Sequence, residues 1–116
     1  MKEFIEYNNI EVLDDENLSV KVNITDNTLN PFKIVHGGLI FTLGDTVMGI
    51  MCQKLGRKAV TLDSSINFLS PGVGKYLTAT CKVLKNGKKT CVLEAEIKND
   101  EGKLVATMTG TYFYIE

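Results

Sequence analysis

The sequence predicts an α+β domain in which an antiparallel sheet wraps around one long central helix. Strand-like alternation of apolar and polar residues runs over 18–24 and resumes after Arg57. Between these stretches, apolar residues recur at helical spacing from Leu39 to Leu55. The chain has 116 residues, enough for one hydrophobic core, so we expect a single domain over residues 1–116.

The first part of the chain is expected to contain one strand and one loop. Residues 1–16 have a mixed pattern that fits a short helix or an irregular lead-in. The strand at 18–24 follows, with its apolar residues on one face. The segment 26–31 is rich in turn-forming residues and predicts a loop.

The helix expected over 39–55 is followed by Gly56, a residue type common just after helices. Apolar residues cover much of its circumference, so most of the helix should be enclosed. Gly44 and Gly49 lower its intrinsic stability. Their presence is explained if backbone or a ligand approaches the helix closely at those positions.

Four strands in hairpin succession are expected after the helix. Turn-forming residues separate them at 71–74, 86–87 and 100–102. Long antiparallel strands and one apolar helix bury their apolar faces if the sheet wraps around the helix. The expected strands cover 60–68, 77–83, 91–97 and 104–115.

Composition and charge exclude several classes of function. A net charge of −1 leaves no basic excess to neutralise a nucleic-acid backbone. Three cysteines without a CxxC pair and a single histidine do not predict a metal site. We expect the cysteines to be buried, unpaired thiols in a reducing compartment. The N-terminus lacks the apolar run of a signal peptide, and no stretch reaches the roughly 18 apolar residues of a membrane span, so the expected location is the cytoplasm.

The first candidate site is the run His36, Gly37 and Gly38, just before the predicted helix. Two glycines leave backbone N–H groups unobstructed, and the first turn of a helix has N–H donors without intrahelical partners. The positive end of the helix dipole reinforces them, which suits an anion or a developing oxyanion. The alternative interpretation is that the glycines only permit a tight turn into the helix.

The second candidate is Asp45, a carboxylate two turns into an apolar helix. Its helical neighbours four residues away are Phe41 and Gly49, so no ion pair along the helix offsets the cost of burying it. Asp45 therefore faces water, pairs with a residue distant in sequence, or is held for chemistry.

The third candidate is the polar face of the strand at 60–68. Thr61, Asp63, Ser65 and Asn67 alternate with apolar residues and should share that face. Such a face is usually solvated. It lines a cleft instead if a second subunit covers it.

The spacing between Gly37 and Asp45 bears on oligomeric state. Eight residues separate them, which is about 12 Å along one helix. A general base must lie within about 3 Å of the group it acts on, or one water molecule away. If both residues act on one carbonyl, the helix start of one subunit must meet Asp45 of another, so the spacing predicts a dimer with shared sites.

Several short motifs stand in order along the chain: Asn30, Val35-His36-Gly37-Gly38, Leu43-Gly44-Asp45, Val60-Thr61-Leu62-Asp63, Asn67-Phe68-Leu69-Ser70-Pro71 and Gly102-Lys103-Leu104-Val105-Ala106. In this order they resemble the PaaI-type hotdog-fold acyl-CoA thioesterases, from around residue 18 to the C-terminus. The resemblance implies a hotdog fold, hydrolysis of an acyl-CoA thioester, and a homodimer or dimer of dimers with active sites at the subunit interface.

The resemblance also implies catalytic roles for four residues. The backbone N–H of Gly37, with Asn30 nearby, would polarise the thioester carbonyl. Asp45 of the partner subunit would activate the attacking water or attack the carbonyl directly. Thr61 would help to hold that water.

The remaining implied roles concern substrate binding. His36 would serve a structural or thioester-side hydrogen-bonding role next to Gly38. The phosphates of coenzyme A need cations near the groove, for which Lys85, Lys88 and Lys89 are candidates, although lysines at a hairpin tip also serve solubility. No metal or cofactor is implied, because coenzyme A enters as part of the substrate.

Two other functional classes stay open at this point. A non-catalytic acyl-CoA sensor would bind the same ligand without turnover, and the presence of Asp45 argues against it. A hotdog hydratase or dehydratase would be expected to carry a histidine and an acid within the helix region. The single histidine of this chain precedes the helix, which argues against that class.

Overall fold

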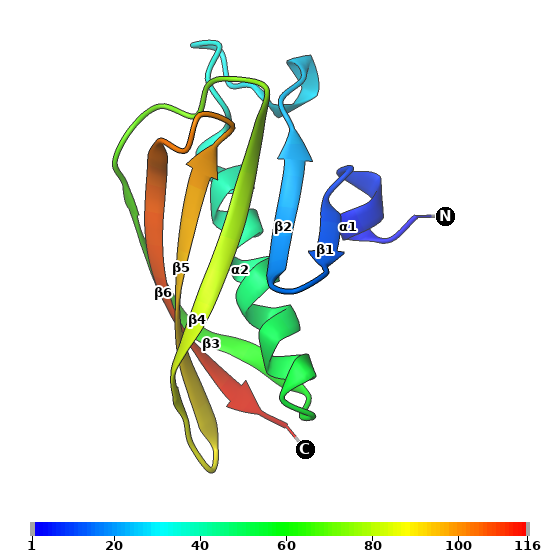
Figure 1. The fold of residues 1–116 in the computed structure, drawn as a ribbon, viewed down its shortest axis with the longest axis vertical. Helices are drawn as coiled ribbons and strands as arrows, with labels where there is room; N and C mark the ends of the chain where they lie inside the picture. Colours follow the sequence, from blue (N-terminus) through cyan, green and yellow to red (C-terminus); the bar gives the residue numbers. More distant parts are fainter. Residues whose placement is uncertain (1, 116) are drawn as a thin grey trace.

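Six antiparallel strands form one sheet that curves around a long helix in the computed structural model, which describes residues 2–115 (Figure 1). Met1 and Glu116, the ends of the predicted domain, lie outside the described residues. The strand order across the sheet is β1-β2-β4-β5-β6-β3. The elements are α1 (Phe4–Tyr7), β1 (Glu11–Asp14), β2 (Leu18–Asn23), a 3-10 turn (Asp26–Thr28), α2 (Gly37–Lys54), β3 (Ala59–Phe68), β4 (Tyr76–Asn86), β5 (Thr90–Asn99) and β6 (Leu104–Tyr114).

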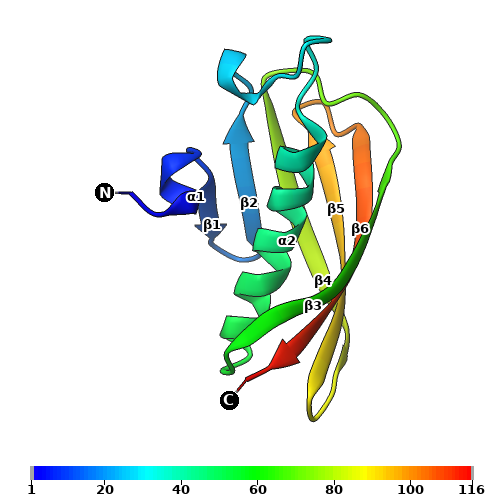
Figure 2. The same cartoon turned by 180° about the vertical axis from the view of Figure 1, so that it is seen from behind.

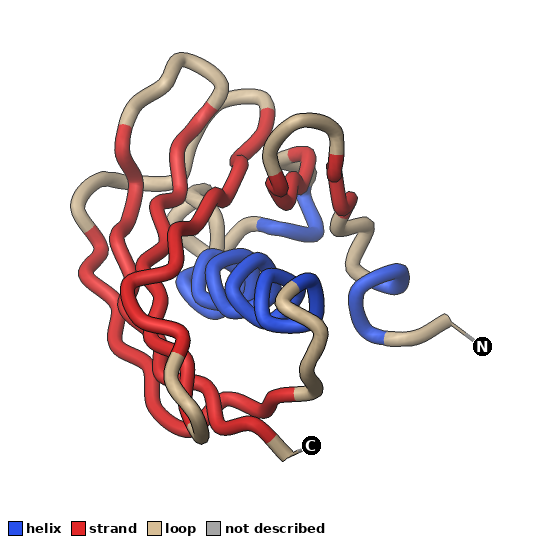
Figure 3. Tube along the Cα trace, turned by 60° about the horizontal axis from the view of Figure 1, so that its bottom comes forward, coloured by secondary structure: helices blue, strands red, loops and turns tan. Residues whose placement is uncertain are grey.

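The central helix and the wrapped sheet confirm the predicted α+β hotdog fold. Helix α2 lies against the concave face of the sheet (Figure 2), and the end-on view shows the strands curving around it (Figure 3). Gly56 follows the helix with a positive φ of 88°, the conformation that favours glycine after a helix end. Within residues 2–115, no helix has both the length and the apolar character needed to cross a membrane.

Strand β1 was not predicted from the mixed pattern of residues 1–16, although the short helix α1 fits one of the two expectations. All four residues of β1 are exposed, so neither face carries the apolar alternation that reveals a half-buried strand. The strand exists because it pairs with β2, with Val12 opposite Val20.

The predicted hairpin succession of four strands is right for β4, β5 and β6 and wrong for β3. Strand β3 pairs with β6 and forms the edge of the sheet opposite β1. Residues 69–75 therefore pass β6 and β5 at one end of the sheet to reach β4 (Figure 1). Backbone hydrogen bonds hold the crossing: the Val35 N–H donates to the Gly72 carbonyl and the Ile24 N–H donates to the Lys75 carbonyl. Local alternation predicts strands but carries no information about their order.

The core lies between α2 and the concave face of the sheet. Gly44 of α2 is one point of close approach, because a Cβ there would lie 2.0 Å from Met108 Sδ. The expected close contact therefore exists, and a side chain of β6 makes it rather than backbone or a ligand. The buried residues of α2 are Ile40, Leu43, Gly44, Val47, Met48 and Cys52, while the opposite side of the helix is half-exposed.

Candidate active site

His36 caps the first turn of α2 and uses most of the donors there. Its Nδ1 accepts a 2.9 Å hydrogen bond from the Gly38 N–H, and its carbonyl accepts from Leu39 and Ile40. Among the described residues, the Gly37 N–H donates to no acceptor. The helix start thus presents one free N–H. Because Nδ1 of the capping imidazole accepts a hydrogen bond, the ring proton lies on Nε2.

Asn30 and Gly37 line the same cavity, which has a volume of about 410 Å³. The Asn30 side-chain carbonyl accepts from the N–H groups of Phe32 and Ile34, which fixes the orientation of the amide. The amide nitrogen makes no hydrogen bond within residues 2–115, so its N–H donors are available. The other lining residues are mostly apolar: Ile34, Val35, Ile40, Phe68, Leu69, Ser70, Pro71 and Gly72.

The ring of Phe68 covers Gly37 at the end of β3. A Cβ at Gly37 would lie 3.3 Å from Phe68 Cζ, so a side chain at this position would press on the ring. The small size of Gly37 therefore leaves room for the Phe68 ring.

The Asp45 carboxylate pairs with residues distant in sequence. Thr61 Oγ1 donates a 2.8 Å hydrogen bond to Asp45 Oδ1, and the Tyr112 hydroxyl donates to the same oxygen at 2.6 Å. The Tyr112 hydroxyl also lies 3.0 Å from the Asp45 carbonyl oxygen. Asp45 Oδ2 accepts no hydrogen bond from the described residues, so one oxygen is held and the other is available.

A β-bulge turns Thr61 toward Asp45. The register of β3 against β6 shifts between Thr61 and Asp63, so Thr61 lies opposite Tyr112 and Asp63 lies opposite Thr111. The predicted single polar face is therefore wrong at Thr61, which faces the helix. The sequence shows no sign of this bulge, because Val60, Leu62, Ile66 and Phe68 keep the same alternation of apolar and polar residues on both sides of it.

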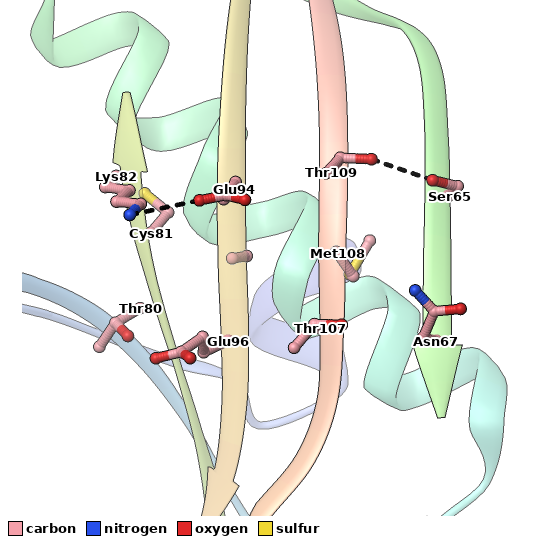
Figure 4. A pocket seen from close by; sticks show the side chains of 11 residues that line it. Ser65, Asn67, Thr80, Cys81, Lys82, Glu94, Glu96, Thr107, Met108 and Thr109 are labelled. Carbon is pink, nitrogen blue, oxygen red and sulfur yellow. Dashed lines mark hydrogen bonds and ion pairs between the residues drawn. The ribbon is translucent and has the colours of Figure 1, made fainter. Parts of the chain in front are cut away.

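Ser65 and Asn67 of the predicted polar face lie on the outer side of the sheet (Figure 4). Ser65 and Asn67 line a cavity of about 490 Å³ there, and Ser65 forms a 2.9 Å hydrogen bond with Thr109. Lys82 and Glu94 form an ion pair across the same surface at 3.4 Å. This surface is on the opposite side of the sheet from α2, the helix that carries Asp45.

Tyr112 is the site residue that sequence reasoning missed. Burial raises the pKa of its phenol, and the hydrogen bond to Asp45 raises it further. The phenol therefore stays protonated and acts as a donor throughout the ordinary pH range. The Tyr-rich character of the last strand was visible in the sequence, but the register that brings Tyr112 to Asp45 was not.

The structure places the candidate residues in two groups, called half-sites below, and does not bring the two groups together within one chain. Asn30 and Gly37 share one cavity, whereas Asp45 and Thr61 are hydrogen-bonded to each other and do not line it. The expected separation of about 12 Å along α2 keeps the two halves apart.

The three candidate lysines surround the β4–β5 hairpin, at the same end of the molecule as the C-terminal end of α2 (Figure 1). Lys85, Lys88 and Lys89 are all exposed. Arg57 anchors this hairpin, donating to the Lys88 carbonyl at 2.8 Å and stacking 3.8 Å from the centroid of the Tyr114 ring. Within one chain, the lysines are therefore not beside the Gly37 cavity.

The family model of the thioesterase superfamily matches residues 32–106. Escherichia coli acyl-coenzyme A thioesterase PaaI is 40% identical over 92 residues, covering 78% of this chain and 66% of PaaI. The chain thus matches slightly less than two thirds of that relative's length.

Solved structures of similar proteins share the fold. A Bacillus halodurans protein with CoA is 34% identical at a TM-score of 0.93, covering 97% of this chain and 78% of that chain. A hypothetical thioesterase from Streptococcus pneumoniae with coenzyme A is 35% identical at a TM-score of 0.86, covering 94% and 90%. Variants of the streptococcal protein with alanine replacing an aspartate or a threonine have also been solved. The chain therefore belongs to the thioesterase superfamily and is of the PaaI type.

Proposed function

We propose that this protein is an acyl-CoA thioesterase that hydrolyses an acyl-CoA thioester to the free acid and CoA. The observation that carries the proposal is the Asp45 carboxylate, with one oxygen held by hydrogen bonds and the other available. A base of this kind and a separate free N–H donor are the two groups that thioester hydrolysis requires. The names of PaaI and of the CoA-bound neighbours support the substrate class.

In the proposed mechanism, the Gly37 N–H and the Asn30 amide bind the thioester oxygen and stabilise the negative charge that develops on it. Asp45 takes a proton from a water molecule, whose oxygen forms the new bond to the carbonyl carbon. The carbon–sulfur bond then breaks and CoA leaves as a thiolate, which takes up the proton. In the variant of this step, an Asp45 oxygen attacks the carbonyl carbon and the carbon–sulfur bond breaks, so that CoA leaves as a thiolate. Water then hydrolyses the resulting mixed anhydride, which releases the free acid and restores the carboxylate.

In this proposal, the hydroxyl of Thr61 holds the water molecule as a hydrogen-bond acceptor. Because Thr61 Oγ1 donates its proton to Asp45 at 2.8 Å, its oxygen can only accept from the water. The water would then lie between the Thr61 oxygen and Asp45. His36 serves as the helix cap, and its Nε2–H is the donor on the thioester side, next to Gly38.

Residue spacing in a relative supports the pairing of Asp45 with Thr61. The alanine variants of the streptococcal thioesterase replace an aspartate and a threonine that lie 16 positions apart. Asp45 and Thr61 are also 16 positions apart, and their side chains are hydrogen-bonded.

A homodimer with shared sites completes the proposal, and the exposed edge of β3 supports it. Val60, Leu62 and Phe68 on this edge strand are 49%, 62% and 55% exposed, which is unusual for apolar residues of a long edge strand. Thr61 and Phe68 mark the two half-sites and lie about 23 Å apart along β3. Antiparallel pairing of two β3 strands about the midpoint would bring the Asp45 half-site of one copy to the Gly37 half-site of the other.

The proposed dimer also gives the three lysines a role. A second copy would bring its own β4–β5 hairpin into the assembly, so that Lys85, Lys88 or Lys89 of one copy could bind the CoA phosphates of a shared site. Lysine acts on phosphate as a point charge and needs no fixed geometry.

The test of the function is release of free thiol from a panel of acyl-CoAs. We expect Asp45→Asn and Asp45→Ala to lose at least about 100-fold in kcat, because the water then lacks its base. Asp15→Asn is the control, because it removes the charge of an exposed aspartate between β1 and β2, outside the proposed β3 interface. It should keep the activity of the wild type.

Equal rates for the wild type and both Asp45 variants would contradict the proposed role of Asp45. Saturable acyl-CoA binding without thiol release would identify a sensor instead. Hydration of an enoyl-CoA without thiol release would identify a hydratase.

A further inference from the structure

We propose that Tyr112 is a positioning residue, which holds the Asp45 carboxylate by one oxygen so that the other faces the reacting water. The inference rests on the proposed function and adds a residue to it. The Tyr112 hydroxyl lies 2.6 Å from Asp45 Oδ1 and 3.0 Å from the Asp45 carbonyl oxygen. One phenol therefore spans the side chain and the main chain of the same aspartate.

The hydrogen bonds fix the orientation of the carboxylate. Thr61 and Tyr112 both donate to Oδ1, and rotation of the carboxylate would break both bonds at once. Hydrogen bonds to a charged oxygen are stronger than those between neutral groups. Oδ2 is left as the oxygen that can accept a proton, with the carboxylate already oriented before substrate binds.

Tyr112 itself is held rigidly. Its side chain is only 2% exposed, and its ring packs near Gly49 of α2 and Gly110 of β6. A Cβ at Gly110 would lie 2.9 Å from Tyr112 Cε1, so glycine at this position makes room for the ring. The pairing of Tyr112 with Thr61 across β6 and β3 fixes the two donors relative to each other.

The phenol has no competing role in this arrangement. Burial, followed by the bond to Asp45, raises the pKa of Tyr112, so the hydroxyl remains protonated and donates at every pH at which the enzyme would be assayed. It therefore does not take a proton from the water. Its contribution is to orient the group that does.

The decisive comparison is Tyr112→Phe against Tyr114→Phe. Both tyrosines are buried on the same face of β6, but the Tyr114 hydroxyl donates to Asn86 rather than to Asp45. We expect Tyr112→Phe to lower kcat about 10- to 100-fold while KM changes less than about twofold. Tyr114→Phe should keep kcat within about twofold of the wild type. Thermal unfolding of both variants shows how much of any change comes from lost stability.

A purely structural role would lower stability without the selective loss of kcat. Thr61→Val removes the other donor, and the double variant with Tyr112→Phe should lose more than the product of the two single losses, because nothing then holds Oδ1. If Tyr112→Phe keeps wild-type kcat while Asp45→Asn is inactive, the positioning role is overturned and the proposed function stands. If Asp45→Asn is as active as the wild type, both are overturned.

Discussion

Gly44 and Gly49 of α2 are five residues apart and face different surroundings. A Cβ at Gly44 would lie 2.0 Å from the sulfur of Met108, in the buried contact between helix and sheet. A Cβ at Gly49 would lie 3.8 Å from the nearest atom of Tyr112, an ordinary van der Waals distance. Alanine favours a helix over glycine at both positions, so the surroundings decide the sign of a substitution.

We therefore predict opposite effects for two substitutions of the same type. Gly44→Ala should lower the free energy of unfolding by about 1–2 kcal/mol, because overpacking outweighs the gain in helix propensity. Gly49→Ala should raise it by about 0.5–1 kcal/mol. Urea unfolding of both variants measures this. A stabilising Gly44→Ala would show that the Met108 side chain moves aside at little cost.

At the residue scale, the sequence indicated the candidate groups but not their partners. Asp45 was recognisable as a carboxylate without an ion-pair partner along its own helix. Its donors, Thr61 and Tyr112, are 16 and 67 positions away, and no local pattern connects residues over such distances. Thr61 was expected to act on water, and its bond to Asp45 depends on a bulge that the sequence does not reveal.

At the scale of elements, α2 and β3 each carry parts of both half-sites. Helix α2 presents the Gly37 N–H at its first residue and Asp45 two turns later. Strand β3 brings Thr61 to Asp45 near one end and Phe68 to Gly37 at the other. The sequence predicted both elements with nearly their observed bounds. It could not predict the edge position of β3, because strand order depends on the crossing of residues 69–75.

Gly37→Pro provides a subunit-mixing test of the shared site. Proline at the first helical position removes the free N–H while retaining a favourable helix start, and the φ of −59° and ψ of 132° at His36 suit a residue before proline. Gly37→Ala keeps the N–H with a similar contact to Phe68, so it should lose less activity than Gly37→Pro.

Mixed dimers of Asp45→Ala and Gly37→Pro subunits should recover activity. One of the two sites in such a dimer combines an intact Gly37 with an intact Asp45, so each mixed dimer should have about half of the wild-type kcat. Random exchange of equal amounts makes about half of the dimers mixed, so the mixture should recover about a quarter of the wild-type activity. Thiol release after refolding the two inactive proteins together measures it. No recovery in confirmed mixed dimers would contradict a site built from two chains.

For the whole molecule, the buried thiols and phenols link stability to alkaline pH. Burial raises the pKa of Cys52 to about 12, and Cys91 adds to the shift. Burial likewise raises the pKa of Cys81 to about 11 and that of Tyr114 to about 12. The expected burial of the cysteines is confirmed for Cys52 and Cys91, while Cys81 is half-buried.

We predict that the free energy of unfolding falls above about pH 9. Unfolded thiols lose their protons near the ordinary pKa of 9.0, whereas the native thiols keep theirs, so unfolding releases protons and is favoured as pH rises. At pH 10 the loss should be on the order of 1 kcal/mol for a buried thiol. Urea unfolding at pH 8 and pH 10 under reducing conditions measures it, and Cys81→Ala should reduce the difference. Equal stability at the two pH values would contradict the raised values.

The exposed edge of β3 has a kinetic consequence if two copies join there. A single chain would carry both half-sites without forming a complete active site. The rate of hydrolysis per chain would therefore depend on the concentration of the chain. Dilution of the protein below the dissociation constant of the dimer would abolish most of the activity without any change in sequence. The cell would then set thioester turnover through the amount of protein it makes, more steeply than in direct proportion.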